Sequence, residues 1–376
     1  MIIDNQKYST QYFSINEERF VDANQKICAS SFNEESYTAH LANEMLPPIH
    51  LNEYKPVLPG IYPIPPRTKW SFQNGVFNKL KSNVKYVKNI DLNSCMRMAN
   101  HLIKVAKGPI AIELSGGLDS SIMIGVFEKL GYEPILIGTI SNLYKFRTER
   151  YIQENIARKF KHVVFSDSYS KQFEDLINTP THFLPHFLSL YHAVGSNTIN
   201  LLNKHKIQYI LEGTGFDEIL VRPSINDINC FRYPSLQGSW FHDYVFQPQG
   251  YSYVDVTSIP SIKQTILSLR RGEAEDTQKW WARRFFANIL PPELSHYAYK
   301  ANFGPLWADG LKSNAEQIDH IIQVARMVSP LPIFRAFNAQ TILEAMNSGK
   351  LSRELFCPLS YANWIHSLHR VDRIAY

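Results

Sequence analysis

Between residues 92 and 211 the sequence alternates between short apolar runs and longer segments with helical periodicity. The short apolar runs are predicted to be buried strands, and the periodic segments are predicted to be helices. The predicted strands are residues 109–114, 133–139, 162–165 and 208–211, and the predicted helices are residues 92–107, 120–130, 149–160 and 189–205. This order indicates an α/β fold with a parallel sheet covered by helices, whose ligands bind at the carboxyl ends of the strands.

The segments on either side of this core have a different character. Residues 1 to about 55 are polar and weakly periodic, which is typical of a few short strands or an extended arm. Five prolines lie in residues 56–66, and they keep that stretch extended because proline fixes φ and lacks an N–H. Residues 68–90 are predicted to form a pair of strands, and the chain beyond about residue 258 is predicted to be mostly helical. We therefore expect a small β-rich N-terminal region, residues 1–90, and a main domain, residues 91–376, with a helical C-terminal part.

Composition excludes several classes of protein. No window approaches the roughly 18 uninterrupted apolar residues of a membrane span, and the first residues do not resemble a signal peptide. The four cysteines are far apart and form no CxxC pair, which predicts separate thiols in a reducing compartment. The 39 basic residues exceed the 34 acidic ones by only five, too small an excess to indicate a nucleic-acid surface. We expect a cytoplasmic enzyme without membrane or nucleic-acid partners.

A glycine- and serine-rich loop follows the first predicted strand. Residues 115–121, SGGLDSS, connect that strand to the next predicted helix. The two glycines allow the backbone to approach a ligand, the serines Ser115, Ser120 and Ser121 offer hydroxyl donors, and the N–H groups at the start of a helix favour a phosphate. Asp119 would repel that phosphate unless Mg²⁺ lay between them, so Asp119 is a candidate metal ligand. The alternative is a tight turn whose Ser and Asp residues cap the helix, but the complete seven-residue pattern after a strand favours a binding loop.

SGGLDSS resembles the PP-loop of ATP pyrophosphatases, specifically the synthetase domain of asparagine synthetase-like enzymes. The resemblance implies an adenine nucleotide alpha-hydrolase-like domain that cleaves ATP between its α and β phosphates and produces an acyl-adenylate and pyrophosphate. The implied cofactors are ATP and Mg²⁺. The residues that the resemblance assigns to nucleotide binding are Leu114, Ser115, Gly116, Gly117, Leu118, Asp119, Ser120 and Ser121 of the PP-loop, Gly138 at the end of the strand expected to contact adenine, and Gly213 and Gly215 of a second loop.

The second loop, residues 212–218 (EGTGFDE), follows the last predicted strand. It resembles the G-x-G-x-D-E loop of the same family, in which the aspartate shares the magnesium-pyrophosphate site with the PP-loop aspartate. The resemblance therefore makes Asp119 and Asp217 the metal ligands, and carboxylates from two strand ends can hold a metal on triphosphate oxygens. Taken alone, this loop could be an ordinary turn with a helix cap.

A third segment supplies a candidate catalytic lysine. Residues 290–294 (LPPEL) and 299–307 (YKANFGPLW) resemble the family's LPxx…K-x-x-F segment, in which a lysine contacts the adenylate. Lys300 matches that lysine, and a cation directed at developing negative charge lowers the barrier of the reaction. The alternative is a surface lysine beside an aromatic cluster. The block of residues 280–286 (WWARRFF) could line a peptide groove or form a buried helix with an arginine edge.

The N-terminal region limits the source of nitrogen. Glutamine-dependent members of the family have a nucleophilic cysteine directly after the initiator methionine, whereas this chain has Ile2. Residues 1–90 therefore resemble a reduced relic of a glutaminase-type domain, and Cys28 cannot act as an N-terminal nucleophile. The nitrogen is expected to come from an amine of the substrate or from free ammonia.

Family members that lack glutaminase activity include β-lactam, carbapenam and lasso-peptide macrolactam synthetases, which adenylate a carboxylate and let an amine of the same molecule attack it. In the β-lactam group a tyrosine paired with a glutamate acts as base at the position of Thr214. The resemblance thus assigns Thr214 to a catalytic position, but a threonine there argues against the β-lactam group. Residues 226–271 contain no glutamate, so the family's usual glutamate base has no obvious counterpart. His242, Tyr244 or Tyr251 could assist, or good positioning could let solvent take the proton.

The resemblance favours intramolecular macrolactam formation on a peptide in natural-product biosynthesis. A precursor peptide and its leader protease would then be partners, and the substrate would be a peptide or small-molecule carboxylate. Three alternatives stay open: an amide ligase that joins a small acid to ammonia or a free amine, a nucleotide-binding pseudoenzyme that serves as a scaffold, and a tRNA-modifying PP-loop enzyme. The absent CxxC pairs and the modest charge disfavour the last.

Overall fold

A computed structural model describes the backbone of the parallel sheet and of most helices. The described residues are 1–5, 11–14, 19–21, 61–64, 68–80, 92–106, 108–139, 147–166, 172–181, 185, 187–213, 242–255, 279–296, 304–329, 332–335, 337–347 and 356–374.

Five parallel strands form the central sheet, in the order β11-β10-β7-β8-β9. Their bounds are β7 Ile110–Leu114, β8 Ile135–Thr139, β9 Val163–Ser166, β10 Tyr209–Glu212 and β11 Ser252–Asp255. The first four confirm the strands predicted from the sequence and their parallel arrangement. The edge strand β11 was not predicted, because only two apolar residues stand between its polar ends Ser252 and Asp255, too short a run to indicate a strand.

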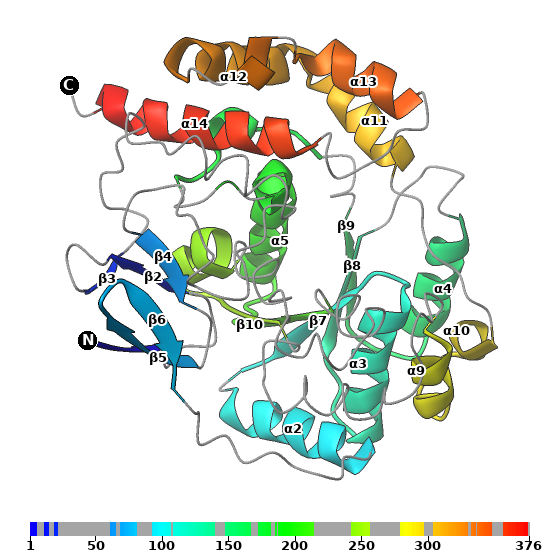
Figure 1. The fold of residues 1–376 in the computed structure, drawn as a ribbon. Coiled ribbons are helices and arrows are strands. Elements are labelled where there is room, and N and C mark those ends of the chain that lie inside the picture. The colour runs from blue at the N-terminus through cyan, green and yellow to red at the C-terminus, as the bar shows by residue number, and fades with distance from the viewer. Residues whose placement is uncertain are drawn as a thin grey trace.

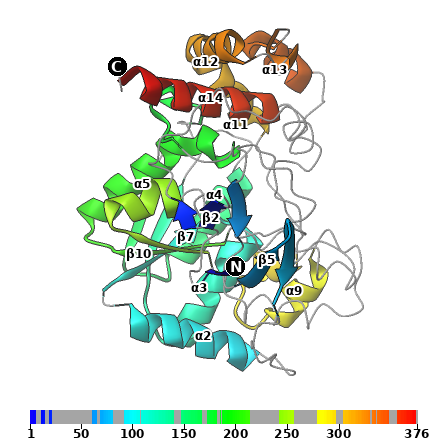
Figure 2. The same ribbon diagram turned by 60° about the vertical axis from the view of Figure 1, so that its left-hand side comes forward.

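Helices cover both faces of this sheet (Figures 1 and 2). One face packs against α2 Leu92–Val105, α3 Leu118–Lys129 and α4 Arg147–Ala157, and the other packs against α5 His192–Lys204 and a π-helix, His242–Phe246. Successive strand residues alternate between the two faces. Ile110 and Ile112 therefore belong to the core under α2–α4, whereas Ala111 between them belongs to the core under α5.

The described residues of the N-terminal region form two small antiparallel sheets, which confirms a β-rich start. One consists of β1 Ile2–Asn5, β5 Thr68–Gln73 and β6 Val76–Lys79, and the other of β2 Gln11–Ser14, β3 Arg19–Val21 and β4 Ile61–Ile64. Asn74 and Gly75 join β5 to β6 with φ of 50° and 78°, the backbone that an Asn-Gly hairpin turn requires. The predicted domain boundary at residue 90 lies outside the described residues.

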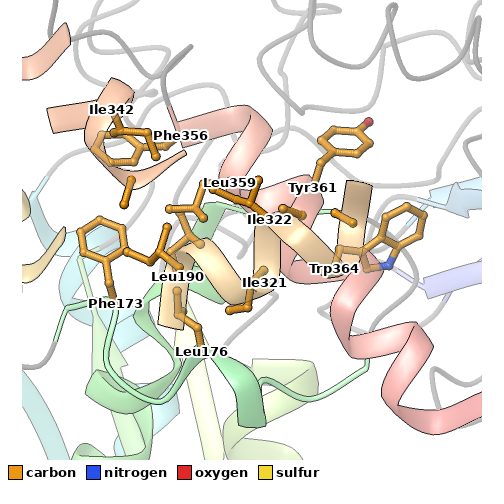
Figure 3. Packing of buried hydrophobic residues seen from close by; sticks show 14 of the residues in the cluster. Phe173, Leu176, Leu190, Ile321, Ile322, Ile342, Phe356, Leu359, Tyr361 and Trp364 are labelled. Carbon is orange, nitrogen blue, oxygen red and sulfur yellow. The ribbon is translucent and has the colours of Figure 1, made fainter. Parts of the chain in front are cut away.

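The C-terminal part is helical, as predicted. Its helices are α9 Trp280–Phe285, α10 Pro292–His296, α11 Gly304–Ser313, α12 Ala315–Val328, α13 Ala339–Asn347 and α14 Phe356–Ile374. Helices α11–α14 gather at the end of the molecule opposite α2 (Figure 1). Their core includes residues from the segment before α5, and Figure 3 shows Phe173, Leu176 and Leu190 of that segment together with Ile321, Ile322, Phe356 and Leu359. Among the described helices, none has the length and hydropathy needed to cross a membrane.

Candidate functional site

The two sequence loops begin on neighbouring strands at the point where the strand order reverses. From β7 the chain proceeds outward to β8 and β9, and it then returns to place β10 on the other side of β7. Connections that leave two such strands in opposite directions open a crevice at their carboxyl ends, where α/β proteins bind ligands. Residues 115–121 follow β7 and Gly213 follows β10, so both predicted loops start at this crevice.

The first turn of α4 fixes the backbone of the PP-loop-like segment. Gly116 has a φ of 77°, in the left-handed region that favours glycine. A Cβ atom at Gly116 would lie 2.8 Å from the backbone oxygen of Glu149 in α4. The side chain of Gln153, one turn further along α4, donates a hydrogen bond of 2.9 Å to the carbonyl oxygen of Leu114. Glycine is therefore required for the close approach of loop and helix.

The serine hydroxyls of the loop bond within the loop. Ser115 Oγ and Ser120 Oγ share a hydrogen bond of 2.8 Å, and Ser115 Oγ also accepts the N–H of Gly117 at 3.2 Å. Ser121 Oγ donates to the carbonyl oxygen of Gly117 at 2.7 Å. These bonds brace the turn, and the role of the hydroxyls as donors to a ligand stays a prediction. Gly117 is the N-cap of α3 and brings no capping side chain, so the helix N-terminus keeps its preference for an anion.

The carboxylate of Asp119 forms an ion pair with Lys279. Asp119 lies in the first turn of α3, and both of its oxygens accept from Lys279 Nζ, at 2.7 and 2.9 Å. Only 10% of the lysine side chain and 22% of the aspartate side chain are exposed. Sequence reasoning missed Lys279, because it belongs to no motif and meets Asp119 only through the fold.

The second loop starts in contact with the first. A Cβ atom at Gly213 would lie 3.1 Å from the backbone nitrogen of Ser120 and 3.2 Å from Cβ of Asp119. Parallel pairing of β7 and β10 thus brings the predicted pair of loops together. The remaining predicted site residues, Thr214, Gly215, Asp217 and Lys300, lie outside the described residues, and their roles stay predictions.

Gly138 lies at the end of β8, opposite Leu114 of β7 in the strand register. A Cβ atom there would lie 2.5 Å from the ring carbons Cδ1 and Cε1 of Phe165 in β9, so the ring covers the backbone of Gly138. The structure places Gly138 one strand away from the loop, and its expected contact with adenine stays a prediction.

Residues 280–285 form helix α9, which buries one face and leaves Trp280 exposed, and the peptide groove stays a prediction. Trp281, Ala282 and Phe286 belong to the core shared with α3, and the buried guanidinium of Arg283 donates to the carbonyl oxygen of Leu294. This packing fixes α9, whose N-cap is Lys279, beside the N-terminus of α3. The helix thereby positions the lysine that pairs with Asp119.

Two of the three residues considered as an aid to proton removal have described side chains. Tyr244 and Tyr251 pack against the core under α5, and the Tyr251 hydroxyl donates to Asn203 of α5. The side chain of His242 lies outside the described set. A role for these residues in proton transfer stays a prediction.

Comparisons with known proteins add little to this geometry. No protein-family model and no curated protein sequence matches the chain. Among solved structures, the chain is similar to a predicted subunit of tRNA methyltransferase from Methanocaldococcus jannaschii, with 18% sequence identity over 50% of this chain and 91% of that one, at a TM-score of 0.24. A TM-score this low does not establish a shared fold, so the candidate site rests on the residues and contacts described above.

Proposed function

We propose that the protein is an ATP- and Mg²⁺-dependent ligase that adenylates a substrate carboxylate, releases pyrophosphate and forms an amide when an amine attacks the adenylate. The observation that carries this proposal is the position of Asp119. It lies in the first turn of α3, at the reversal point of a parallel sheet and in contact with Gly213, the start of the second family-like loop. A glycine-rich turn, a helix N-terminus and a carboxylate at one crevice suit a metal-bound polyphosphate.

The residues present fit a magnesium-bound pyrophosphate group. The ammonium of Lys279 already binds both oxygens of Asp119, which indicates that this carboxylate accepts a cation at that position. Mg²⁺ in nucleotide sites is usually held by one or two carboxylates together with phosphate oxygens. Asp119 would supply one carboxylate and Asp217 the second, since four residues of chain after Gly213 reach at most about 14 Å. When bound, the metal would neutralise charge on the departing pyrophosphate.

The protein groups would contribute binding and positioning. The first-turn N–H groups of α3 would bind the β and γ phosphates, and the hydrogen bond from Gln153 to Leu114 would keep the loop in its binding conformation. Lys300 would stabilise charge at the acyl centre, and Thr214 would lie beside the reacting groups. A bound adenylate and amine held in contact react faster mainly because their relative orientation is already set.

The proposed substrate is a peptide that the enzyme closes into a macrolactam, with a precursor peptide and its leader protease as partners. This choice rests on the family resemblance of residues 115–121 and 212–218. Ligation of a small acid to ammonia or a free amine would use the same two steps, adenylation and amide formation. An assay would distinguish it from macrolactam formation by which acid and which amine are consumed.

One observation favours a second candidate function, a nucleotide-binding scaffold without catalysis. The ion pair of Asp119 with Lys279 neutralises the carboxylate that a metal would need. In that case ATP would bind and no pyrophosphate would form.

The proposed function is tested by measuring AMP and pyrophosphate after incubation with MgATP and panels of carboxylates, amines and precursor peptides. We expect substrate-dependent release of both products, and a cyclised peptide lighter by one water. Asp119→Asn should lower the rate by about 100-fold or more, the scale of losing a group that stabilises transition-state charge. Glu133→Gln is the matched control, because Glu133 is a carboxylate also paired with a lysine, Lys161, just before the amino-terminal ends of β8 and β9. The proposal fails if no substrate yields pyrophosphate, or if Asp119→Asn is as active as Glu133→Gln.

A further inference from the structure

We propose that Lys279 is a polyphosphate-binding residue that exchanges partners: it neutralises Asp119 in the free protein and moves onto phosphate oxygens when the metal-bound polyphosphate arrives. This inference rests on the proposed function, and it adds an order of binding. Because the lysine ammonium blocks Asp119, the metal enters together with the polyphosphate and not before it.

The contact geometry supports such an exchange. Lys279 Nζ lies 2.7 Å and 2.9 Å from the two carboxylate oxygens, so both atoms that could bind a metal are already used. Most of the surface of both side chains is removed from water. Both partners of a buried ion pair lose hydration energy, so separating them would leave two unpaired charges. A metal-bound polyphosphate avoids this cost, because the metal can pair with Asp119 while the phosphate oxygens pair with Lys279.

The surrounding charges favour an anion. The N-terminus of α3 carries the equivalent of about half a positive charge, which stabilises Asp119 but repels the Lys279 ammonium. Of these three groups, the helix N-terminus and the ammonium are positive and Asp119 alone is negative. A phosphate group placed beside them would interact favourably with both the amides and the lysine.

The backbone conformation at Lys279 is unfavourable for lysine, so we infer that the side chain is the reason for a lysine at this position. Lys279 has φ of 56° and ψ of 37°, a left-handed conformation that is less favourable for lysine than for glycine or asparagine. Its carbonyl oxygen accepts the N–H of Arg283 at 3.0 Å, and the neighbouring Trp281 and Ala282 are buried. The α carbon is thus fixed by α9, while the four-carbon stem lets the ammonium move from a carboxylate to a nearby phosphate.

Two titrations on the full-length protein test this exchange: Mn²⁺ alone, followed by electron paramagnetic resonance, and pyrophosphate in the presence of Mg²⁺, followed by calorimetry. Lys279→Gln should weaken binding of magnesium pyrophosphate by about tenfold or more, yet bind Mn²⁺ alone about threefold or more tightly, because Asp119 is released. Lys279→Arg keeps the charge and should stay within about threefold of wild type for pyrophosphate. Lys161→Gln, which breaks the exposed pair with Glu133, should match wild type in both titrations.

A merely structural lysine would give a different pattern. The inference is overturned if Lys279→Gln alters pyrophosphate affinity by less than about twofold, or if it weakens Mn²⁺ and pyrophosphate binding together. If the wild type binds neither ATP nor pyrophosphate with Mg²⁺, the proposed function fails, and the role of Lys279 fails with it. If magnesium pyrophosphate binds in a Lys279-dependent manner but AMP never forms, the exchange stands and only the ligase proposal is lost.

Discussion

At the scale of single residues, Gly116 and Gly131 share a left-handed backbone conformation, but only Gly116 is packed closely against another part of the chain. Both have positive φ, 77° and 71°. A Cβ atom at Gly116 would meet the backbone of Glu149 at 2.8 Å, whereas a Cβ atom at Gly131 would meet nothing within 4 Å. The sequence pattern identified Gly116 as part of a binding loop, but only the fold shows that α4 is what requires glycine there.

Replacing Gly116 with alanine should therefore cost more stability than replacing Gly131. Both substitutions place alanine in the left-handed region, at about 1–2 kcal/mol, and Gly116→Ala adds overpacking against α4 of about 1–3 kcal/mol. Chemical denaturation of the two variants measures the difference. Gly116→Ala should also weaken nucleotide binding, because the loop must move. Equal losses of stability in the two variants would contradict the described contact between loop and helix.

At the scale of secondary-structure elements, the close contact of α3 with the turn after α9 determines where Lys279 lies. Gly125 is buried in the middle of α3, and a Cβ atom there would lie 2.3 Å from the backbone oxygen of Ile289. The helix could be predicted from the sequence to within about two residues at either end, whereas the reason for a glycine in its middle is a packing contact that no local pattern reveals.

Gly125→Ala should destabilise the protein in spite of the better helix propensity of alanine. The propensity gain is about 1 kcal/mol, and a Cβ atom inside the contact distance of a backbone oxygen outweighs it, for a net loss of about 1–2 kcal/mol. The α9 turn would shift away from α3, so the affinity for magnesium pyrophosphate should fall as well. Gly108→Ala serves as the control, since a Cβ atom at Gly108 meets nothing within 4 Å. A stabilised Gly125→Ala variant would show that the two elements are not packed this closely.

The order of elements could be predicted from the sequence because hydrophobic periodicity is local, and the site could be predicted only in part. The loops after β7 and β10 carry glycine and aspartate patterns, and their predicted proximity is confirmed at Gly213. The ion pair of Asp119 with Lys279 joins residues 160 positions apart, and no pattern along the chain links them. Strand β11 was missed for a related reason, since its place in the sheet comes from pairing with β10 and not from its own composition.

At the scale of the whole molecule, the joint between the sheet domain and the C-terminal helices contains ionisable and polar groups. Arg370 of α14 donates to the carbonyl oxygen of Thr179 at 3.0 Å, and buried Asn363 of α14 donates to the hydroxyls of Thr179 and Ser189. Near this joint, burial lowers the pKa of His192, the first residue of α5. The charge of Arg370 lowers this pKa further, and Asp175 opposes the shift. The joint therefore favours neutral His192.

This shift makes the stability of the joint sensitive to acid. In the unfolded chain His192 takes up a proton near its ordinary pKa of about 6.5, whereas in the folded protein it stays neutral to lower pH. The unfolded state then binds more protons, so the contribution of His192 is complete above about pH 6.5 and is lost as the pH falls below it. Denaturation curves at pH 7.5 and 5.5 should show a smaller loss of stability for His192→Gln than for wild type. Parallel losses in the two proteins would place the acid sensitivity elsewhere.

The central claim is that the crevice beside Asp119 binds ATP through a metal-bound polyphosphate. Calorimetric titration of a non-cleavable ATP analogue, with and without Mg²⁺, into wild type, Asp119→Asn and Glu133→Gln tests it most directly. We predict metal-dependent binding to wild type and Glu133→Gln, and affinity lower by about tenfold or more for Asp119→Asn, which is a loss of about 1.4 kcal/mol. Absence of binding to wild type, or equal metal-dependent affinity for all three proteins, would contradict the account.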